Sequence, residues 1–412
     1  MDWLNKYKKI FLAAAFILVI FGLGYLLYAV FFKPSPPLPG AITPLATSTV
    51  AGSLPAAKSG AGQIIQDGTS GNLAPELSST APASQTAQGG LTQTSELNQA
   101  PSLGATLAAD GADLLYYNQP DGKFYRLTKD GQATLLTDAV FHEVQKITWS
   151  PDKNKAILEY PDQAKIIYDF KNNKQISLPG HWQDFSFSPE GSKIVMKSLA
   201  DDPSNRWLAV ISSQGTDAQR VASLGSKDET VYPSWSPNNQ IVAMYTEGQN
   251  YDQQSVFFVG LNNENFKSLT IDGRGFESKW SPQGERLLYS VYSSASGLKP
   301  ELWLASAQGE NIGASRAKLN VQTWADKCVF ADSTSLYCAV PDSLEEGAGL
   351  FPELAKNASD SLYKIDTRTG LKKLIAIPDG RFSMSNLLIS SNGYYLYFTD
   401  ANTERINKIK LK

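Results

Sequence analysis

The sequence is poor in the side chains that most metal sites and many catalytic sites require. Its 412 residues include only two histidines, His142 and His181, and two cysteines, Cys328 and Cys338. Because transition metals are usually held by clusters of these residue types, we expect no metal site. Cys-x-x-Cys pairs, His-x-x-x-His pairs and glycine-rich phosphate loops are missing as well, so we expect no cofactor.

An excess of charge of one sign is also missing. Lysine and arginine number 37, aspartate and glutamate 40, and the two signs are evenly mixed along the chain. Proteins that bind nucleic acid concentrate positive charge in a patch or stripe. The composition therefore predicts no nucleic-acid partner.

A hydrolase active site is not indicated either. The sequence has no Gly-x-Ser-x-Gly elbow, and a Ser-His-Asp triad would have to use His142 or His181. Both histidines stand in segments with the character of loops, TDAVFHEV and GHWQDF. We interpret them as ordinary loop residues, and we predict no catalytic residues and no enzymatic activity.

One long apolar run is present, at residues 10–32. It holds 23 residues without a charge, which at about 1.5 Å per residue spans a bilayer core of about 30 Å. No small-x-small cleavage site follows it, so we expect a transmembrane anchor rather than a cleaved signal peptide or a buried core helix.

The lysines around this run predict its orientation. Lys6, Lys8 and Lys9 precede it, whereas Lys33 alone follows before a long neutral stretch. The positive-inside rule keeps residues 1–9 in the cytoplasm and places the rest of the chain outside. We predict a single-pass protein of the inner membrane of a bacterial-type cell.

Residues 33–102 are rich in Pro, Ser, Thr, Ala, Gly and Gln and contain almost no aromatic residues. Such a segment cannot bury enough apolar surface to offset the entropy of ordering it. We predict a disordered linker over 33–102 and a folded domain over 103–412.

A turn motif recurs through the folded part. WSPDKNKAIL, FSPEGSKIVM, WSPNNQIVAM and WSPQGERLLY each place an aromatic residue before a Ser-Pro turn. Ser, Pro, Asp or Asn, and Gly each favour a particular position of a β-turn. Aligning the turns gives seven copies, and the residues directly before them, the anchors, are Leu107, Trp149, Phe187, Trp235, Trp280, Phe330 and Ile389.

Each copy also predicts strands. Apolar residues seven and nine positions past the anchor, such as Ile194 and Met196, share one strand face because strand side chains alternate. A second hairpin signal follows, which makes four strands per unit. Repeated four-stranded units predict an all-β, seven-bladed β-propeller, with six or eight blades as alternatives.

The repeat resembles the WSPDG-type, WD-repeat-like propeller repeat of TolB-like proteins and of the propeller halves of prolyl-oligopeptidase-type enzymes. The resemblance covers about residues 103–412. It implies a propeller fold, and from the TolB-like relatives it implies a protein-interaction module of the cell envelope.

The seventh unit is one strand short. After Ile389 the sequence supplies three strand segments, NLLIS, YYLYFTD and RINKIKLK. Either the outer strand of the last blade is absent, or a piece of the linker before Leu103 adds to it. The linker has no clear strand pattern, which favours absence.

Cys328 and Cys338 lie symmetrically about the turn at Ser333, so they should face each other across one hairpin. Outside the cytoplasm a disulfide is the favoured interpretation. The alternative is a pair of small buried apolar residues.

Long loops are expected on one rim of the propeller. In a four-stranded blade the first and third turns fall on one rim, and the second turn and the inter-blade link fall on the other. The long segments 198–206, 246–254, 292–301 and 341–361 all correspond to second turns. Long loops on a rigid scaffold predict a binding surface.

The longest of these loops contains three apolar residues in a polar, acidic context. They either anchor a protein partner or fold back onto the blade, and folding back is slightly favoured. The candidate partner-binding residues are Leu350, Phe351, Leu354, Glu345, Glu346, Asp201 and Asp202.

The sequence therefore predicts a membrane-anchored, extracytoplasmic propeller that acts as a non-catalytic scaffold for a protein partner or envelope component. The alternative is a propeller that binds or processes a small molecule or glycan in its central channel. Polar side chains converging on the channel would favour the alternative. A filled channel with an exposed apolar patch near Phe351 would favour the scaffold.

Overall fold

The computed structural model describes residues 18, 21–23, 25 and 82–412. The predicted cytoplasmic segment 1–9, most of the predicted anchor 10–32 and the linker as far as residue 81 lie outside the described residues. Among the residues that are described, no helix is long and apolar enough to cross a membrane. The part from residue 82 onward belongs to one compact unit.

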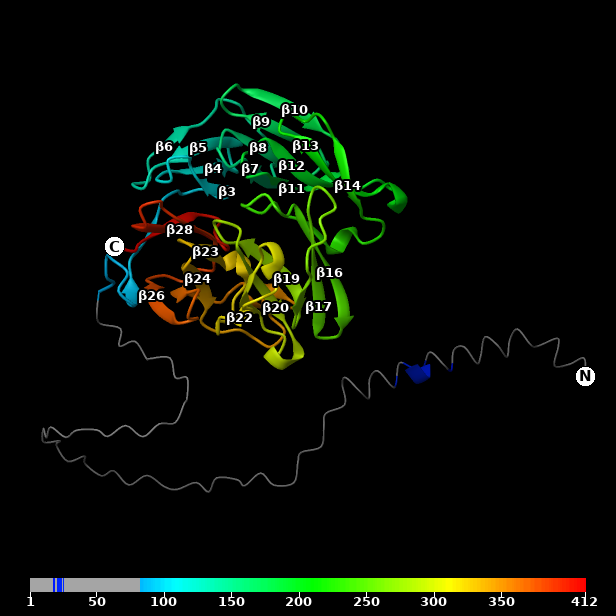
Figure 1. The fold of residues 1–412 in the computed structure, drawn as a ribbon. Helices are drawn as coiled ribbons and strands as arrows, with labels where there is room; N and C mark the ends of the chain where they lie inside the picture. Colours follow the sequence, from blue (N-terminus) through cyan, green and yellow to red (C-terminus); the bar gives the residue numbers. More distant parts are fainter. Residues whose placement is uncertain (1–17, 19–20, 24, 26–81) are drawn as a thin grey trace, which may run out of the picture. The chain divides into compact units, whose positions relative to one another are not determined.

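Seven sheets follow one another along this unit (Figure 1). The prediction of an all-β, seven-bladed β-propeller is confirmed. Blades one to three are β3 Ser102–Leu107, β4 Leu114–Asn118, β5 Lys123–Leu127, β6 Ala133–Leu135; β7 Lys146–Trp149, β8 Lys155–Glu159, β9 Lys165–Asp169, β10 Lys174–Leu178; and β11 Trp182–Phe187, β12 Lys193–Ser198, β13 Trp207–Ser212, β14 Gln219–Ser223.

Blades four to seven continue the series in chain order. They are β15 Val231–Pro233, β16 Ala243–Asn250, β17 Gln253–Val259, β18 Leu269–Ile271; β19 Arg274–Trp280, β20 Arg286–Tyr292, β21 Glu301–Ser306, β22 Ala317–Lys318; β23 Cys328–Phe330, β24 Ser335–Pro341, β25 Asp360–Asp366, β26 Lys372–Pro378; and β27 Met384–Ile389, β28 Tyr395–Asp400, β29 Ile406–Lys410.

The repeated turn joins the first two strands of each blade. Six of the seven anchors are the last residue of the first strand, and Trp235 lies two residues beyond β15. The serine after the anchor closes the turn: Ser150 Oγ accepts a hydrogen bond from Lys155 N at 3.0 Å, and Ser236 Oγ accepts one from Ile241 N at 2.9 Å. Lys153 adopts φ +61°, the left-handed conformation that glycine takes in most of the other copies.

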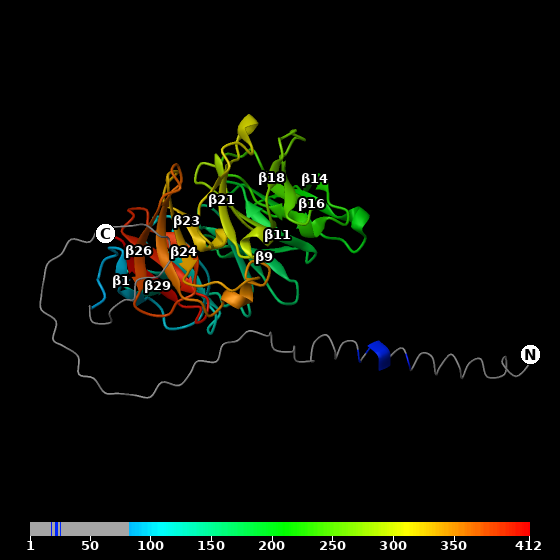
Figure 2. The same cartoon turned by 90° about the horizontal axis from the view of Figure 1, so that it is seen from below.

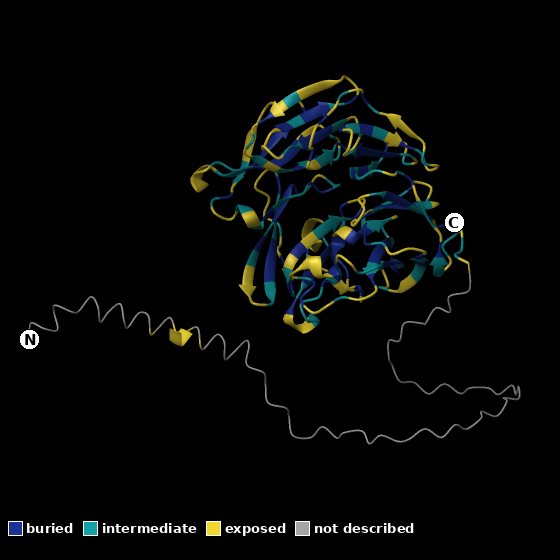
Figure 3. Cartoon of the chain, turned by 180° about the vertical axis from the view of Figure 1, so that it is seen from behind, coloured by how far each residue is buried: buried dark blue, intermediate teal, exposed yellow. Residues whose placement is uncertain are grey.

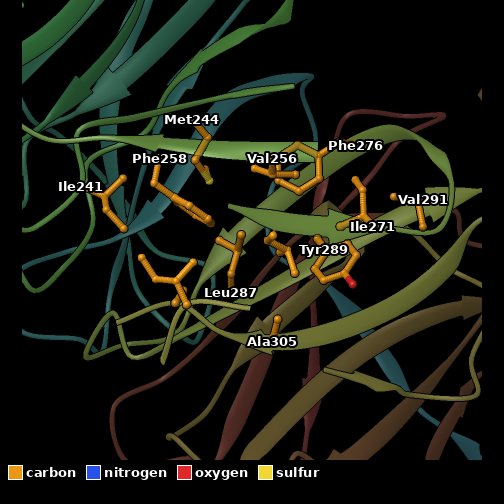
Figure 4. Packing of buried hydrophobic residues seen from close by; sticks show 13 residues of the cluster. Ile241, Met244, Val256, Phe258, Ile271, Phe276, Leu287, Tyr289, Val291 and Ala305 are labelled. Atoms are coloured by element: carbon orange, nitrogen blue, oxygen red, sulfur yellow. The ribbon is translucent and has the colours of Figure 1, made fainter. Parts of the chain in front are cut away.

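The core lies between blades, as the apolar pairs predict. Ile194 and Met196 are both 0% exposed, and the corresponding residues of the other copies are buried too. Between blades four and five, Met244 and Phe258 pack with Leu287 and Tyr289 (Figure 4). The second strands of the blades, such as β12, are mostly buried, whereas outer strands such as β6 and β10 carry exposed residues, as do many turns and loops (Figure 3). Each blade thus buries its faces against its neighbours.

The closure of the ring differs from the expectation. We expected the outer strand of blade seven to be absent, but β2 (Thr94–Glu96) fills that place and pairs antiparallel with β29. The preceding strand β1 (Gly90–Thr92) pairs parallel with β26 on the edge of blade six (Figure 2). Residues 82–101 therefore belong to the fold, and the predicted linker boundary at 102 is wrong for them.

The sequences of these two strands carry no strand signal, for a physical reason. An outer strand touches other protein on one edge only, so it needs few apolar residues. Strand β2 has the sequence Thr-Ser-Glu and no fully buried residue, while Thr92 is the one fully buried member of β1. Neither strand shows the apolar alternation by which strands are recognised.

Cys328 and Cys338 lie directly opposite each other in the β23–β24 hairpin, and their Sγ atoms form a disulfide. Both residues are 0% exposed and belong to the core between blades five and six. A loop of ten residues restricts the unfolded chain only modestly, so the disulfide acts as a local staple.

Candidate functional site

Loop length separates the two rims of the propeller. We call the rim that carries the second turns and the inter-blade links the loop rim, and the opposite one the turn rim. The strand order places the connections 199–206, 293–300 and 342–359 together on the loop rim, in blades three, five and six. The prediction that the long connections share one rim is confirmed.

The prediction of a fourth long loop, at residues 246–254, is wrong. This segment is not a loop, because β16 and β17 extend through it and leave only Tyr251 and Asp252 at the tip. Tyr251 is 60% exposed, and the Arg274 guanidinium lies 4.1 Å from the centre of its ring. Asp252 accepts a hydrogen bond from Ser294 N at 2.9 Å, which ties this hairpin to the blade-five connection.

The connection 342–359, which we call the long loop, is held against blade five. Gly347 N donates to Gly297 O at 3.0 Å, and Gly349 N donates to Leu298 O at 2.7 Å. A Cβ added at Gly349 would come within 2.7 Å of that same oxygen. The close approach therefore requires glycine, and the loop has a defined conformation over the rim.

Inside the long loop, apolar residues divide between two environments. Leu344, Ala348 and Ala355 pack with Trp324, which lies on the link into blade six. Leu350, Phe351 and Leu354 instead remain 43%, 51% and 43% exposed. The loop does fold back, but through residues other than the three that we expected to do so. We call Leu350, Phe351 and Leu354 the apolar patch.

The acidic candidates do not form one cluster. Glu345 and Glu346 are exposed in the long loop, in the same segment as the apolar patch. Asp201 and Asp202 are exposed in the blade-three connection, with blades four and five between them and blade six. A backbone hydrogen bond from Ser204 lowers the pKa of Asp202, because Asp202 caps the short helix Pro203–Asn205. Its role there is local.

A cavity that sequence reasoning missed opens beside the long loop. Its volume is about 340 Å³, and we call it the mouth cavity. Blade five supplies Glu277 from β19, and the link into blade six supplies Asp326 and Lys327. The long loop adds Glu353 and Lys356. Charged side chains from three separate chain segments thus converge on one space.

The carboxylates of the mouth cavity influence one another. Neighbouring protein partly desolvates the Glu277 carboxyl, and the negative charge of Asp326 adds to this effect, so the pKa of Glu277 is raised to about 7 although the residue is still exposed to solvent. On the same strand, burial lowers the pKa of Lys279, whose Nζ donates to Cys328 O at 2.6 Å. Glu277 therefore exchanges its proton near neutral pH.

A buried ion pair forms the wall behind the cavity. Lys327 Nζ lies 2.7 Å from Asp360 Oδ2, with side-chain exposures of 10% and 0%. The same oxygen accepts a hydrogen bond from Met384 N at 2.6 Å, while Oδ1 has no partner among the described residues. Burial raises the pKa of Asp360, and Lys327 offsets part of this effect.

Two further cavities lie against the innermost strands. One, of about 570 Å³, is lined by β3, β7 and β27. The other, of about 390 Å³, contains Lys146, Asp184 and Lys197. Asp184 forms ion pairs with both lysines, at 3.3 Å and 2.9 Å. Charged side chains thus line one of the cavities beside the innermost strands, while an apolar patch is exposed on the loop rim. The first feature is compatible with a ligand in the channel, and the second is compatible with a protein scaffold.

His142 and His181 are both exposed, and both lie in inter-blade links. Within the described residues, no three His, Cys, Asp or Glu side chains come together as a metal site would require. The signal that could have pointed to the mouth cavity is Glu277 and Lys279, two charged residues in a strand that leads to the anchor Trp280.

The likeness of this chain to known proteins lies in its fold. No protein-family model and no curated protein matches the sequence. An oligogalacturonate lyase solved in complex with manganese superposes with a TM-score of 0.56 and 14% identity, over 77% of this chain and 93% of that chain. The β-propeller domain of Cps50 (Swd1) from Myceliophteria thermophila gives 0.52 and 10% identity, over 77% of this chain and 100% of that chain.

A prolyl endopeptidase gives a TM-score of 0.52 with 14% identity, over 76% of this chain and 49% of that chain. At these identities the similarity shows the propeller fold alone, since one fold carries many functions. The chain is therefore a seven-bladed β-propeller protein, and its function has to be argued from its own surfaces.

Proposed function

We propose that this protein is a non-catalytic interaction module that holds a protein partner on its loop rim. The observation that carries the proposal is the apolar patch: Leu350, Phe351 and Leu354 are 43–51% exposed on a loop held rigidly by other residues. A large apolar side chain on an ordered support loses little entropy when a partner covers it.

The sequence supports a place for this module in the cell envelope. The uncharged run at residues 10–32 and the lysines before it favour a single membrane anchor with the propeller outside the cytoplasm. The WSPDG-type repeat favours a TolB-like relationship and thus an envelope partner. The Cys328–Cys338 disulfide is compatible with an oxidising compartment.

Replacing the apolar patch with polar residues is expected to abolish binding of the partner protein. In the triple variant L350S/F351S/L354S of the full chain, recovery of the bound protein should fall at least about tenfold, as for a hot spot worth about 1.4 kcal/mol or more. Quantitative co-purification from the envelope of cells that express each form measures this. Unfolding midpoints should change little, because the three residues are about half exposed and lie outside the core.

The matched control is L371S/Y394S. Leu371 and Tyr394 are 73% and 49% exposed and lie in turns of the turn rim. A protein that is kept by this control and lost by the patch variant supports the proposal. Equal recovery with all three forms would contradict it.

A small-molecule or glycan ligand in the channel is the second candidate, favoured by the cavities along the innermost strands, one of which is lined by charged residues. The variant K197M would remove the β12 lysine that pairs with Asp184 in the cavity of about 390 Å³. A thermal shift that a glycan induces in the unmodified chain, and that K197M abolishes, would favour this candidate over the scaffold.

A further inference from the structure

We propose that the mouth cavity receives a basic side chain, lysine or arginine, of the protein that the apolar patch contacts. This inference rests on the proposed scaffold function and adds the chemistry of the partner. The partner segment would present a cationic residue next to an apolar one.

Charge is the first argument. Glu277, Asp326 and Glu353 line the cavity, and within the described part of the chain none of their carboxylates has an ion-pair or hydrogen-bond partner. Lys327 is engaged by Asp360, so Lys356 is the one unengaged lysine in the lining. These three residues are exposed around one cavity, and carboxylates in excess around one cavity attract a cation, since complementary charge would relieve the repulsion between them.

Shape and polarity are the second argument. Besides the charged groups, Trp324, Pro352 and Met384 line the cavity, which gives it apolar walls. Lysine and arginine combine an aliphatic stem with a charged end, so they suit a space with apolar walls and acidic groups. The volume of about 340 Å³ is at the lower end of the range of ligand pockets.

Continuity with the apolar patch is the third argument. The short helix Pro352–Ala355 separates the two features. Pro352, Glu353 and Ala355 line the cavity, while Phe351 and Leu354 of the same segment are exposed. One partner segment can therefore cover the patch and place its next side chain in the cavity.

A metal ion fits the site less well. No group of three acidic, histidine or cysteine side chains in the described residues lies close enough together to hold one. A divalent metal needs several oxygen ligands at about 2.0–2.6 Å from one point. An extended organic cation can instead satisfy carboxylates that stand apart.

The test reads the cavity directly, with the full chain carrying 13C-methyl methionine. Met384 lines the mouth cavity, whereas Met196 and Met244 are buried in the cores of blades three and four and serve as internal controls. The probes are N-acetyl-arginine amide, N-acetyl-lysine amide and the uncharged N-acetyl-citrulline amide. We expect the Met384 methyl resonance to shift with the two cationic probes only.

The double variant E277Q/D326N should weaken binding of the arginine probe at least about tenfold, because two carboxylates lose their charge. The matched variant D130N/E310Q neutralises two exposed acidic residues in turns of the turn rim and should bind as the unmodified chain does. Unchanged Met196 and Met244 resonances show that each variant is folded.

Binding should also depend on pH. The charged groups around Glu277 are Lys279 on its own strand, Asp326 and Lys327 on the link, and Glu353 and Lys356 on the long loop. Because the pKa of Glu277 is about 7, raising the pH from about 6 to about 8 should tighten binding of the arginine probe by up to about tenfold. In E277Q this dependence should vanish.

Three results would overturn the inference: equal shifts with the citrulline probe, a Met384 shift produced by calcium chloride alone, or full binding by E277Q/D326N. Each leaves the scaffold function standing if the patch variant still loses its partner. Conversely, retention of the partner by the patch variant, together with binding of the arginine probe, would contradict the scaffold function and leave a cation site.

Discussion

Removing residues 1–98 will lower the free energy of unfolding by at least about 4 kcal/mol relative to a chain that begins at Pro82. The longer deletion removes β1 and β2, which close the ring on blades six and seven. The shorter one keeps both strands. Urea unfolding followed by tryptophan fluorescence measures the difference.

Several contacts account for this magnitude. Leu97 is 8% exposed and packs with Tyr397 and Ile406, and loss of a buried leucine costs about 2–5 kcal/mol. Its backbone N donates to Ile406 O at 2.9 Å. Thr94 N donates to Asp379 Oδ1 at 2.9 Å, and each hydrogen bond contributes about 0.5–1.5 kcal/mol.

The point variant L97A should lower the free energy of unfolding by about half or more of the amount that the deletion does. It keeps both strands but removes the side chain that packs against Tyr397 and Ile406. Equal unfolding midpoints for the chains that begin at residues 82 and 99 would contradict a role of β1 and β2 in closure. The ring would then be held by blade contacts alone.

Replacing Lys327 by methionine will destabilise the protein by about 3–5 kcal/mol, because it leaves the buried Asp360 without its counter-ion. The loss should grow with pH. Burial raises the pKa of Asp360, so the folded variant holds a proton more strongly than the unfolded chain does. Stability is then greatest at low pH and falls as the pH rises through the folded-state pKa.

Two further variants make this result specific. K327M/D360N removes the charge from both partners and should recover part of the lost stability. The control K227M breaks the ion pair between Lys227 and Glu247, whose side chains are 64% and 42% exposed, and should leave stability nearly unchanged because solvent screens an exposed pair. Equal losses for K327M and K227M, measured by urea unfolding at about pH 5 and about pH 8, would contradict the buried-pair assignment.

The fold could be predicted because its signal is local and repeated. Turn residues such as Ser236 and Asn239 form hydrogen bonds with residues at most five positions away, Ile241 and Trp235 respectively, and the apolar pair that follows lies on one strand. Such short-range chemistry is visible in sequence. The rim that carries the long loops followed from the same reasoning, because strand order alone determines it.

The rest depends on contacts between distant segments. Strand β2 is short and polar, and it is a strand because β29 offers it an unpaired edge. The mouth cavity joins Glu277, Asp326 and Glu353 from three segments, and no pattern in any one of them predicts the others. The apolar patch is exposed because other residues of the long loop contact Trp324. Which residues make that contact is decided by the tertiary structure, and the composition of the loop does not reveal it.

The closure of the ring by β2 and β29 has a consequence for folding during translation. Asn98 accepts a hydrogen bond from Ile406, 308 residues later, so the first strands leave the ribosome long before their partners exist. At about 5–20 residues per second, this wait lasts on the order of 15–60 s. The circle can be completed only after translation of the final strand, and until then the nascent chain carries unpaired edges that a chaperone would recognise.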